Sequence, residues 1–177
     1  ASQTTTIEKL EEKFGMASNN SFANYSFLFG GTNDNLEEIK RLDKKACSGV
    51  KLFLGSSTGN MLVDDEEVIE KIFRNTEMVI SAHCEDEGTI RRNLEKYKSE
   101  YGDDIPIKCH PEIRSVEACY LSSSKAIDLA KKTGARLHVF HLSTGKETDL
   151  FRNDIPLGEK KITAEVCIHH LWFSDED

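Results

Sequence analysis

Short apolar runs alternate with amphipathic stretches along this chain, a pattern typical of an α/β fold. Apolar residues at helical spacing predict helices at Thr4–Met16, Asn35–Lys45, Asp64–Phe73, Thr89–Tyr101, Ser115–Thr133 and Lys146–Asn153. Continuous apolar runs predict strands at Asn24–Gly31, Val50–Leu54, Met78–Cys84, Arg136–Leu142 and Lys161–His169.

The order of strands and helices predicts one α/β domain, residues 1–177, with a parallel sheet. Only the polar segment Glu85–Pro111 interrupts this order. A (β/α)8 barrel takes about 200 to 250 residues, or roughly 30 for each strand and its helix. The chain accounts for five such units, so it is either an open doubly wound sheet or the middle of a larger barrel.

Composition narrows the classes of partner. The net charge of −8 argues against a nucleic-acid partner, and no run approaches the roughly 18 apolar residues that span a membrane. We therefore expect neither nucleic acid nor membrane as a partner. The 5 cysteines have no CxxC spacing, which indicates reduced thiols in a cytoplasmic protein.

Lys51 stands inside the apolar run Val50–Leu54, directly before a Gly/Ser/Thr loop at Gly55–Gly59. A free ammonium would be badly desolvated there, so it must be paired, deprotonated or chemically changed. The alternative is a structural lysine whose stem is buried and whose head reaches solvent at the strand end.

Two histidines, His83 and His141, lie at or next to the carboxyl ends of other predicted strands, where active sites of parallel α/β folds collect. Imidazole and an anionic oxygen donor both suit zinc. A neutral lysine amine can add carbon dioxide to give a carbamate, which binds metals as a carboxylate does. This chemistry requires a lysine pKa lowered by burial.

The other histidines are weaker candidates. His138 and His141 are three residues apart, so alternation along a strand predicts that they face opposite sides, with His138 a structural residue packed under a helix. His169 and His170 are adjacent, and one of them is a candidate for the mouth of the site. His110 has no partner that the sequence identifies.

The residues after His83 have structural interpretations. Cys84 should point away from the site as a reduced thiol. Glu85 and Asp86 are either acceptors that orient a ligating histidine or solvated loop acids.

Four segments, GVKLFLGSSTG, ISAHCED, RLHVFHLSTGKE and ITAEVCIHHLWFSDED, resemble in order successive parts of the dihydroorotase family. This family lies in the cyclic-amidohydrolase branch of the amidohydrolase superfamily. The resemblance extends from Thr4 onward and includes the segment HPEIRSVEACYL.

This resemblance implies a (β/α)8 barrel, of which the chain holds about strands three to seven, with one or two zinc ions. It implies that Lys51 is the carbamylated bridging ligand, that His83 and His141 are further ligands, and that His169 and His170 lie near the substrate on the seventh strand. The implied reaction is the reversible cyclisation of N-carbamoyl-L-aspartate to L-dihydroorotate in pyrimidine biosynthesis. As partners we expect this small-molecule substrate and further copies of the chain in a homo-oligomer.

The sequence also departs from the family. It has no His-x-His pair, and the arginine that follows that pair and binds the substrate carboxylate is absent with it. No general base is identified within the chain, because the family's aspartate would lie beyond Asp177. We expect these residues to be the interior of a longer enzyme and to be inactive in isolation.

Three other functions stay open. Allantoinases and hydantoinase-like enzymes share the lysine and histidine positions. A metal-free homologue could serve as a scaffold, although the presence of Lys51, His83 and His141 argues against it. A Schiff-base aldolase would use a buried lysine but gives no reason for the two histidines.

Overall fold

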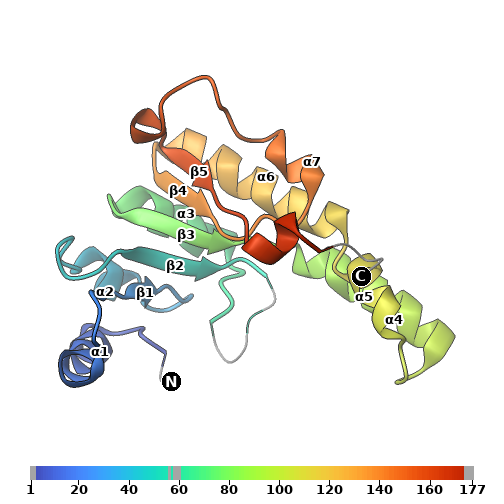
Figure 1. The fold of residues 1–177 in the computed structure, drawn as a ribbon, viewed down its shortest axis with the longest axis horizontal. Helices are drawn as coiled ribbons and strands as arrows, with labels where there is room; N and C mark the ends of the chain where they lie inside the picture. The colour runs from blue at the N-terminus through green and yellow to red at the C-terminus, as the bar shows by residue number, and fades with distance from the viewer. Residues whose placement is uncertain (1–2, 56, 58–60, 174–177) are drawn as a thin grey trace.

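The computed structural model describes residues 3–55, 57 and 61–173 and is built around a five-stranded parallel sheet (Figure 1). The strands are β1 (Leu28–Gly30), β2 (Gly49–Phe53), β3 (Val79–His83), β4 (Arg136–Val139) and β5 (Ile162–Ala164). Each strand pairs with the next one in the chain, in the order β1-β2-β3-β4-β5. A doubly wound sheet reverses its strand order at one point, whereas a (β/α)8 barrel does not. The sequential order therefore matches consecutive strands of a barrel.

Seven α-helices and three 3₁₀ helices connect and follow these strands in the described part of the chain. The α-helices are α1 (Ile7–Asn20), α2 (Leu36–Lys40), α3 (Glu66–Asn75), α4 (Glu87–Tyr101), α5 (His110–Ile113), α6 (Val116–Thr133) and α7 (Gly145–Thr148). The 3₁₀ helices are η1 (Ile107–Cys109), η2 (Leu157–Glu159) and η3 (Ile168–Leu171). The caps explain several boundaries, since Thr6, Asp65 and Ser115 each accept a hydrogen bond from a backbone N–H in the first turn of α1, α3 and α6.

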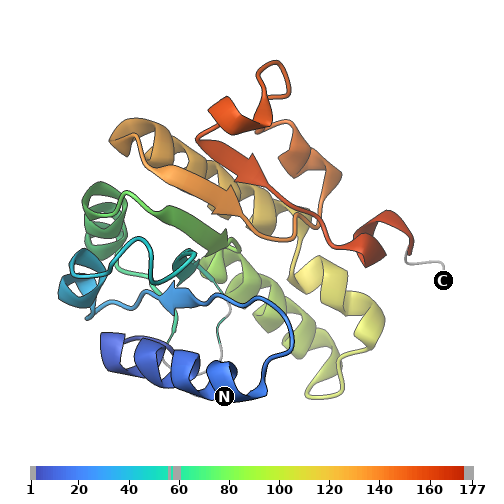
Figure 2. The ribbon, with the colours of Figure 1, turned by 60° about the vertical axis from the view of Figure 1, so that its left-hand side comes forward.

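The two faces of the sheet differ in chemistry. One face is apolar and covered by helices, and its residues Val50, Leu52, Ile80, Leu137 and Val139 are at most 1% exposed. Figures 1 and 2 show α6 lying along this sheet. The strand register places Lys51, Ser81, His138 and Thr163 in one row across β2 to β5, on the opposite face. This second face corresponds to the interior of a barrel.

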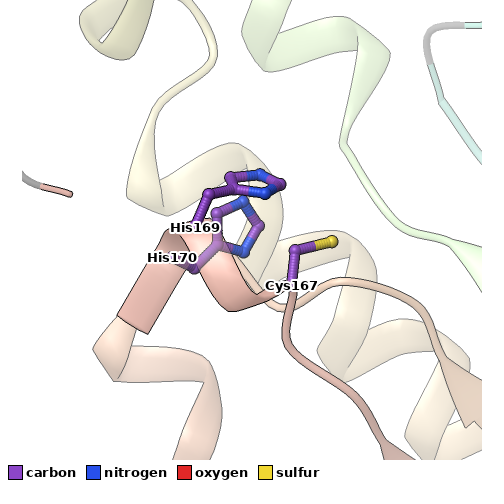
Figure 3. A group of neighbouring side chains, drawn as sticks. All are labelled: Cys167, His169 and His170. Atoms are coloured by element: carbon purple, nitrogen blue, oxygen red, sulfur yellow. The ribbon is translucent and has the colours of Figure 1, made fainter. Parts of the chain in front are cut away.

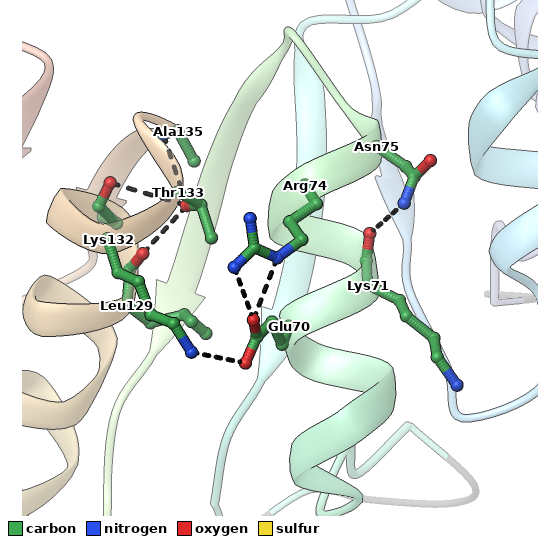
Figure 4. A network of polar contacts seen from close by, with 9 residues as sticks. Glu70, Lys71, Arg74, Asn75, Leu129, Lys132, Thr133 and Ala135 are labelled. Carbon is green, nitrogen blue, oxygen red and sulfur yellow. Dashed lines mark hydrogen bonds and ion pairs between the residues drawn. The ribbon is translucent and has the colours of Figure 1, made fainter.

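The helical layer is joined at its surface by a charged network between α3 and α6 (Figure 4). Glu70 on α3 accepts hydrogen bonds from Arg74 of the same helix at 2.7 and 2.9 Å, and from Lys132 of α6 at 3.0 Å. Arg74 and Lys132 are exposed and Glu70 is partly exposed, so solvent screens these ion pairs and the network contributes little free energy.

The segment between β3 and α6 forms a small core of its own. Ile90 on α4 packs with Cys109, Ile113 and Ala118, and the Asn93 side-chain amide donates to the backbone carbonyls of residues 112 and 113 at 3.1 Å. These contacts fix α5 against α4 and so determine the position of Arg114, the residue that follows α5.

Several predicted elements are shorter than the sequence pattern suggested. The region 24–31 contains only the three residues of β1, the predicted helix 35–45 contains only α2, and the region 146–153 contains only the single turn of α7. The predicted strand 161–169 is wrong beyond Ala164, and His169 and His170 lie in η3. Apolar residues continue beyond the strand ends into loops and turns. The spacing of apolar residues alone cannot distinguish such a loop from a strand. Most of the predicted Gly/Ser/Thr loop, at residues 56, 58 and 59, lies outside the described residues.

Candidate metal centre

The structure brings two of the predicted ligands into contact. His83 is the last residue of β3, and its Nδ1 lies 3.2 Å from Nε2 of His141, with the two ring centroids 5.0 Å apart. Two nitrogen ligands of one tetrahedral zinc ion, each at about 2.0 to 2.1 Å from the metal, lie about 3.3 Å apart. The separation of these two nitrogens therefore fits a shared metal ion.

The backbone of His141 makes this approach possible. β4 ends at Val139, and His141 has φ of 37°, the one positive φ among the described residues other than glycine. A strand residue directly after Phe140 would point to the helix-covered face, whereas this conformation directs the ring toward His83. The cost of holding a non-glycine residue in this region, of order 1 kcal/mol, is typical of functional sites.

His141 is held in the neutral form that binds metals. Burial lowers the pKa of His141, and the nearby His83 and Lys51 lower it further, against a raising contribution from a backbone hydrogen bond. A neutral imidazole keeps a lone pair for a metal ion.

The other nitrogen of His83 faces a buried carboxylate. Nε2 of His83 lies 2.7 Å from Oε2 of Glu85, which is 6% exposed. Arg114 donates to the same carboxylate, at 2.8 Å through Nε and with a second bond through Nη2. Burial alone would raise the pKa of Glu85, but the hydrogen bonds from His83 and Arg114 outweigh it and lower the pKa to about 2. Glu85 is thus an anion that fixes the ring of His83, as expected of a carboxylate behind a metal ligand.

Asp86 has a different role from Glu85. Its side chain accepts a hydrogen bond from the backbone N–H of Thr89 at 2.9 Å and caps α4. The sequence makes both Glu85 and Asp86 candidates for the acceptor that orients a ligating histidine. Of the two, only Glu85 contacts a candidate ligand.

Lys51 lies on the same face as His83, one row farther from the strand ends. Its Nζ is 4.6 Å from the ring centroid of Phe53 and 4.1 Å from that of Phe140, and no described carboxylate forms an ion pair with it. Burial lowers the pKa of Lys51 to about 8, and Cys84 and Glu165 only partly oppose this effect. The amine is therefore partly neutral near physiological pH, the state that reacts with carbon dioxide. Lys51 makes no direct contact with His83 or His141 among the described interactions.

The prediction for His138 is wrong. His138 shares the row of Lys51 on the inner face, where its Nδ1 lies 2.9 Å from Oγ1 of Thr163 and its Nε2 lies 3.3 Å from Glu165. Alternation separates residues three apart only while the strand continues, and here the strand ends before His141. Both histidines therefore reach the same side of the sheet.

The remaining histidines form no described contact with Lys51, His83 or His141. His169 and His170 are exposed on η3, where Nδ1 of His170 lies 3.0 Å from the carbonyl oxygen of Leu142. His110 is exposed at the start of α5. All five cysteines are free thiols, and burial raises the pKa of Cys84 to about 12, so that this thiol is unreactive.

A cavity of about 340 Å³ opens beside the histidine pair. It is lined by His83, Glu85, His110, Arg114, His141 and Thr144, among others. Arg114, Phe53 and Phe140 are the site residues that sequence reasoning missed. The segment HPEIRSVEACYL contains Arg114, but no local pattern indicates that its guanidinium lies against Glu85.

Comparison with known proteins places this geometry in context. A dihydroorotase of Methanosarcina mazei is 26% identical over 98% of this chain, and an allantoinase of Deinococcus radiodurans is 26% identical over 97%. A dihydroorotase of Deinococcus radiodurans is 34% identical over 56% of the chain. No protein-family model matches the sequence.

Solved structures agree in fold. The L-hydantoinase of Arthrobacter aurescens superimposes with a TM-score of 0.82 at 24% identity, over 92% of this chain. A D-hydantoinase superimposes with a TM-score of 0.78 at 22% identity, over the whole chain.

The chain resembles the cyclic amidohydrolases. The predicted fold, an α/β chain that forms part of a (β/α)8 barrel, is confirmed by this similarity and by the strand order. The chain spans 39% of the length of the Methanosarcina mazei dihydroorotase and 36% of that of the Arthrobacter aurescens L-hydantoinase. Among the described helices, none is long and apolar enough to cross a membrane.

Proposed function

We propose that this chain forms the metal-binding part of a cyclic amidohydrolase, with Lys51, His83 and His141 as ligands to one or two zinc ions. The observation that carries the proposal is the 3.2 Å approach of His83 Nδ1 to His141 Nε2, with Glu85 behind His83. The donor set also fits, because neutral imidazoles and an anionic oxygen suit zinc. Lys51 would supply that oxygen as a carbamate, for which its low pKa is required.

The reaction we propose is that of a dihydroorotase, the reversible cyclisation of N-carbamoyl-L-aspartate to L-dihydroorotate in pyrimidine biosynthesis. Two segments support this choice, ISAHCED around His83 and TAEVCIHHL after β5, which resemble the dihydroorotase family. Dihydroorotases are also among the relatives that align over nearly the whole chain. We propose a cytoplasmic homo-oligomer as the working form.

Each residue of the centre has a defined task in this proposal. A bound zinc ion would polarise the amide carbonyl and lower the pKa of water toward neutrality. Glu85 and Arg114 hold the ring of His83 in one orientation. The backbone conformation of His141 keeps its Nε2 directed at Nδ1 of His83. Phe53 and Phe140 keep the Lys51 amine partly desolvated.

A second candidate is allantoinase. An allantoinase of Bacillus velezensis is 29% identical over 98% of the chain, so similarity alone does not choose between the two substrates. The ligands do not choose either, because they act on the amide group that both rings contain.

The decisive test is an assay of the zinc-loaded protein, at its natural full length, with L-dihydroorotate, allantoin and a hydantoin as separate substrates. We expect turnover of dihydroorotate, with loss of activity and of the zinc held at the histidine pair in His83→Ala and His141→Ala. His110→Ala, which removes an exposed histidine, is the matched control and should keep its zinc. Turnover of allantoin alone would mean that allantoin, and not L-dihydroorotate, is the substrate, and would leave the proposed metal centre unchanged. Zinc at the histidine pair without turnover of any of the three substrates would overturn the proposed reaction, whereas absence of zinc from the histidine pair would overturn the metal centre and favour the metal-free scaffold.

A further inference from the structure

A second group of metal-binding side chains lies at the start of η3, outside the centre described above. One ligand atom from each of Cys167, His169 and His170 lies within 4.8 Å of the others. Figure 3 shows the Cys167 side chain on the segment that leads into η3 and the two imidazole rings close together on its turn. The ring centroids of the two histidines are 4.3 Å apart.

One of these rings already has the arrangement of a metal ligand. Nδ1 of His170 lies 3.0 Å from the carbonyl oxygen of Leu142, which can only accept a hydrogen bond, so Nδ1 carries the proton. The lone pair of the neutral ring is therefore on Nε2. A histidine that donates one N–H to a backbone carbonyl and offers its other nitrogen is the usual form of a metal-bound histidine.

The donor set selects the class of metal. A thiolate and two imidazoles suit zinc, cobalt or copper and not magnesium or calcium, which prefer oxygen ligands. Nitrogen and sulfur ligands of one tetrahedral zinc ion lie about 3.3 to 3.6 Å apart, so the side chains need to approach one another by at most about 1.5 Å. Both histidines are exposed and Cys167 is half-buried, so rotation of their side chains meets little packing.

We propose that Cys167, His169 and His170 bind a divalent transition-metal ion, with zinc as the native ion and water in the fourth position. This site shares no residue with the centre of Lys51, His83 and His141. Through His170 and Leu142, the ion would hold η3 against the carboxyl end of β4. Its role is structural: it fixes the segment that follows β5 against Leu142, the residue after His141.

Cobalt(II) provides a test that separates the two centres. A thiolate bound to cobalt gives a charge-transfer absorption in the near ultraviolet, and Cys167 is the only thiolate donor in either proposed ligand set. We expect titration of the metal-free protein with cobalt(II) to produce this absorption, and Cys167→Ser to abolish it. His169→Ala and His170→Ala should weaken cobalt binding at this site at least tenfold.

Trp172 offers an independent signal, because it follows η3 directly and is the single tryptophan of the sequence. Cobalt at this site should quench its fluorescence in the original protein and not in Cys167→Ser.

Controls distinguish this proposal from the proposed function. The double variant His83→Ala, His141→Ala should retain the charge-transfer absorption and the quenching even though the other centre is lost, and His110→Ala should retain both signals. Circular dichroism of each variant checks that it is folded. Cobalt binding without thiolate absorption, or absorption that survives in Cys167→Ser, would overturn this site without affecting the other centre.

Discussion

The Glu85 carboxylate lies 2.7 Å from Nε2 of His83, on the opposite side of the ring from the nitrogen that faces His141. Its position fixes which nitrogen of His83 is available to a metal. Glu85→Gln keeps the shape but removes the negative charge, so we expect zinc affinity to fall by about 10- to 100-fold. Competition with a chelator measures this change.

Glu95→Gln is the matched control, because Glu95 is exposed on α4 and lies outside the centre. Its zinc affinity should equal that of the original protein. An unchanged affinity in Glu85→Gln would mean that the carboxylate does not orient His83 for metal binding.

Lys51 should lower the stability of the metal-free fold, although it contributes to metal binding. Its pKa is about 8 in the folded chain and 10.5 in the reference state, so the folded chain loses this proton first as pH rises. The cost of burying the ammonium is complete below about pH 8 and decreases between pH 8 and 10.5. In metal-free protein depleted of carbon dioxide, Lys51→Met should therefore raise the free energy of unfolding at pH 7 by about 1 to 3 kcal/mol.

Denaturant unfolding at pH 7 and near pH 10 measures this effect, with the exposed Lys98→Met as a control. The increase in the free energy of unfolding caused by Lys51→Met should be smaller near pH 10 than at pH 7. The same Lys51→Met variant should retain less zinc. If it instead binds zinc as well as the original protein, Lys51 is not a ligand.

Arg114 should govern stability in acid. The pKa of Glu85 is lowered to about 2 from 4.5, so its contribution to stability is present above about pH 4.5 and is lost as pH falls toward 2. Arg114→Met removes the guanidinium and leaves the buried carboxylate with one partner fewer. We expect a loss of about 1 to 3 kcal/mol at pH 7 and an acid transition at higher pH.

The control for this prediction is Arg152→Met. Arg152 and Asp154 also form an ion pair, at 2.6 Å, but both side chains are exposed. Solvent screens such a pair, so its removal should leave stability nearly unchanged. Equal losses in the two variants would contradict the buried role of Arg114.

His138 and His141 both reach the inner face, and substitutions can separate their roles. His141→Ala removes the nitrogen that faces His83 and should abolish binding at the histidine pair. His138→Ala removes a side chain that contacts Thr163 and Glu165, so zinc should be retained. Isothermal titration with zinc distinguishes the two variants, and the reverse result would exchange their assignments.

The sequence by itself determined the elements and their order. The helix that begins at Ser115 and the apolar runs around Lys51 and His83 depend on residues only a few positions away, which is why the local pattern located them. It also placed Lys51 and His83 on neighbouring strands, and the presence of a lysine in an apolar run indicated a lowered pKa.

The tertiary structure alone decided which side chains meet. His83 and His141 are 58 residues apart, and Glu85 and Arg114 are 29 apart, so their contacts depend on strand register and on the packing of α4 and α5. The direction of His141 depends on a positive φ after the strand end, which alternation does not predict. Local spacing sets the conformation of each segment, whereas long-range packing sets the distances between segments, and the chemistry of this centre depends on those distances.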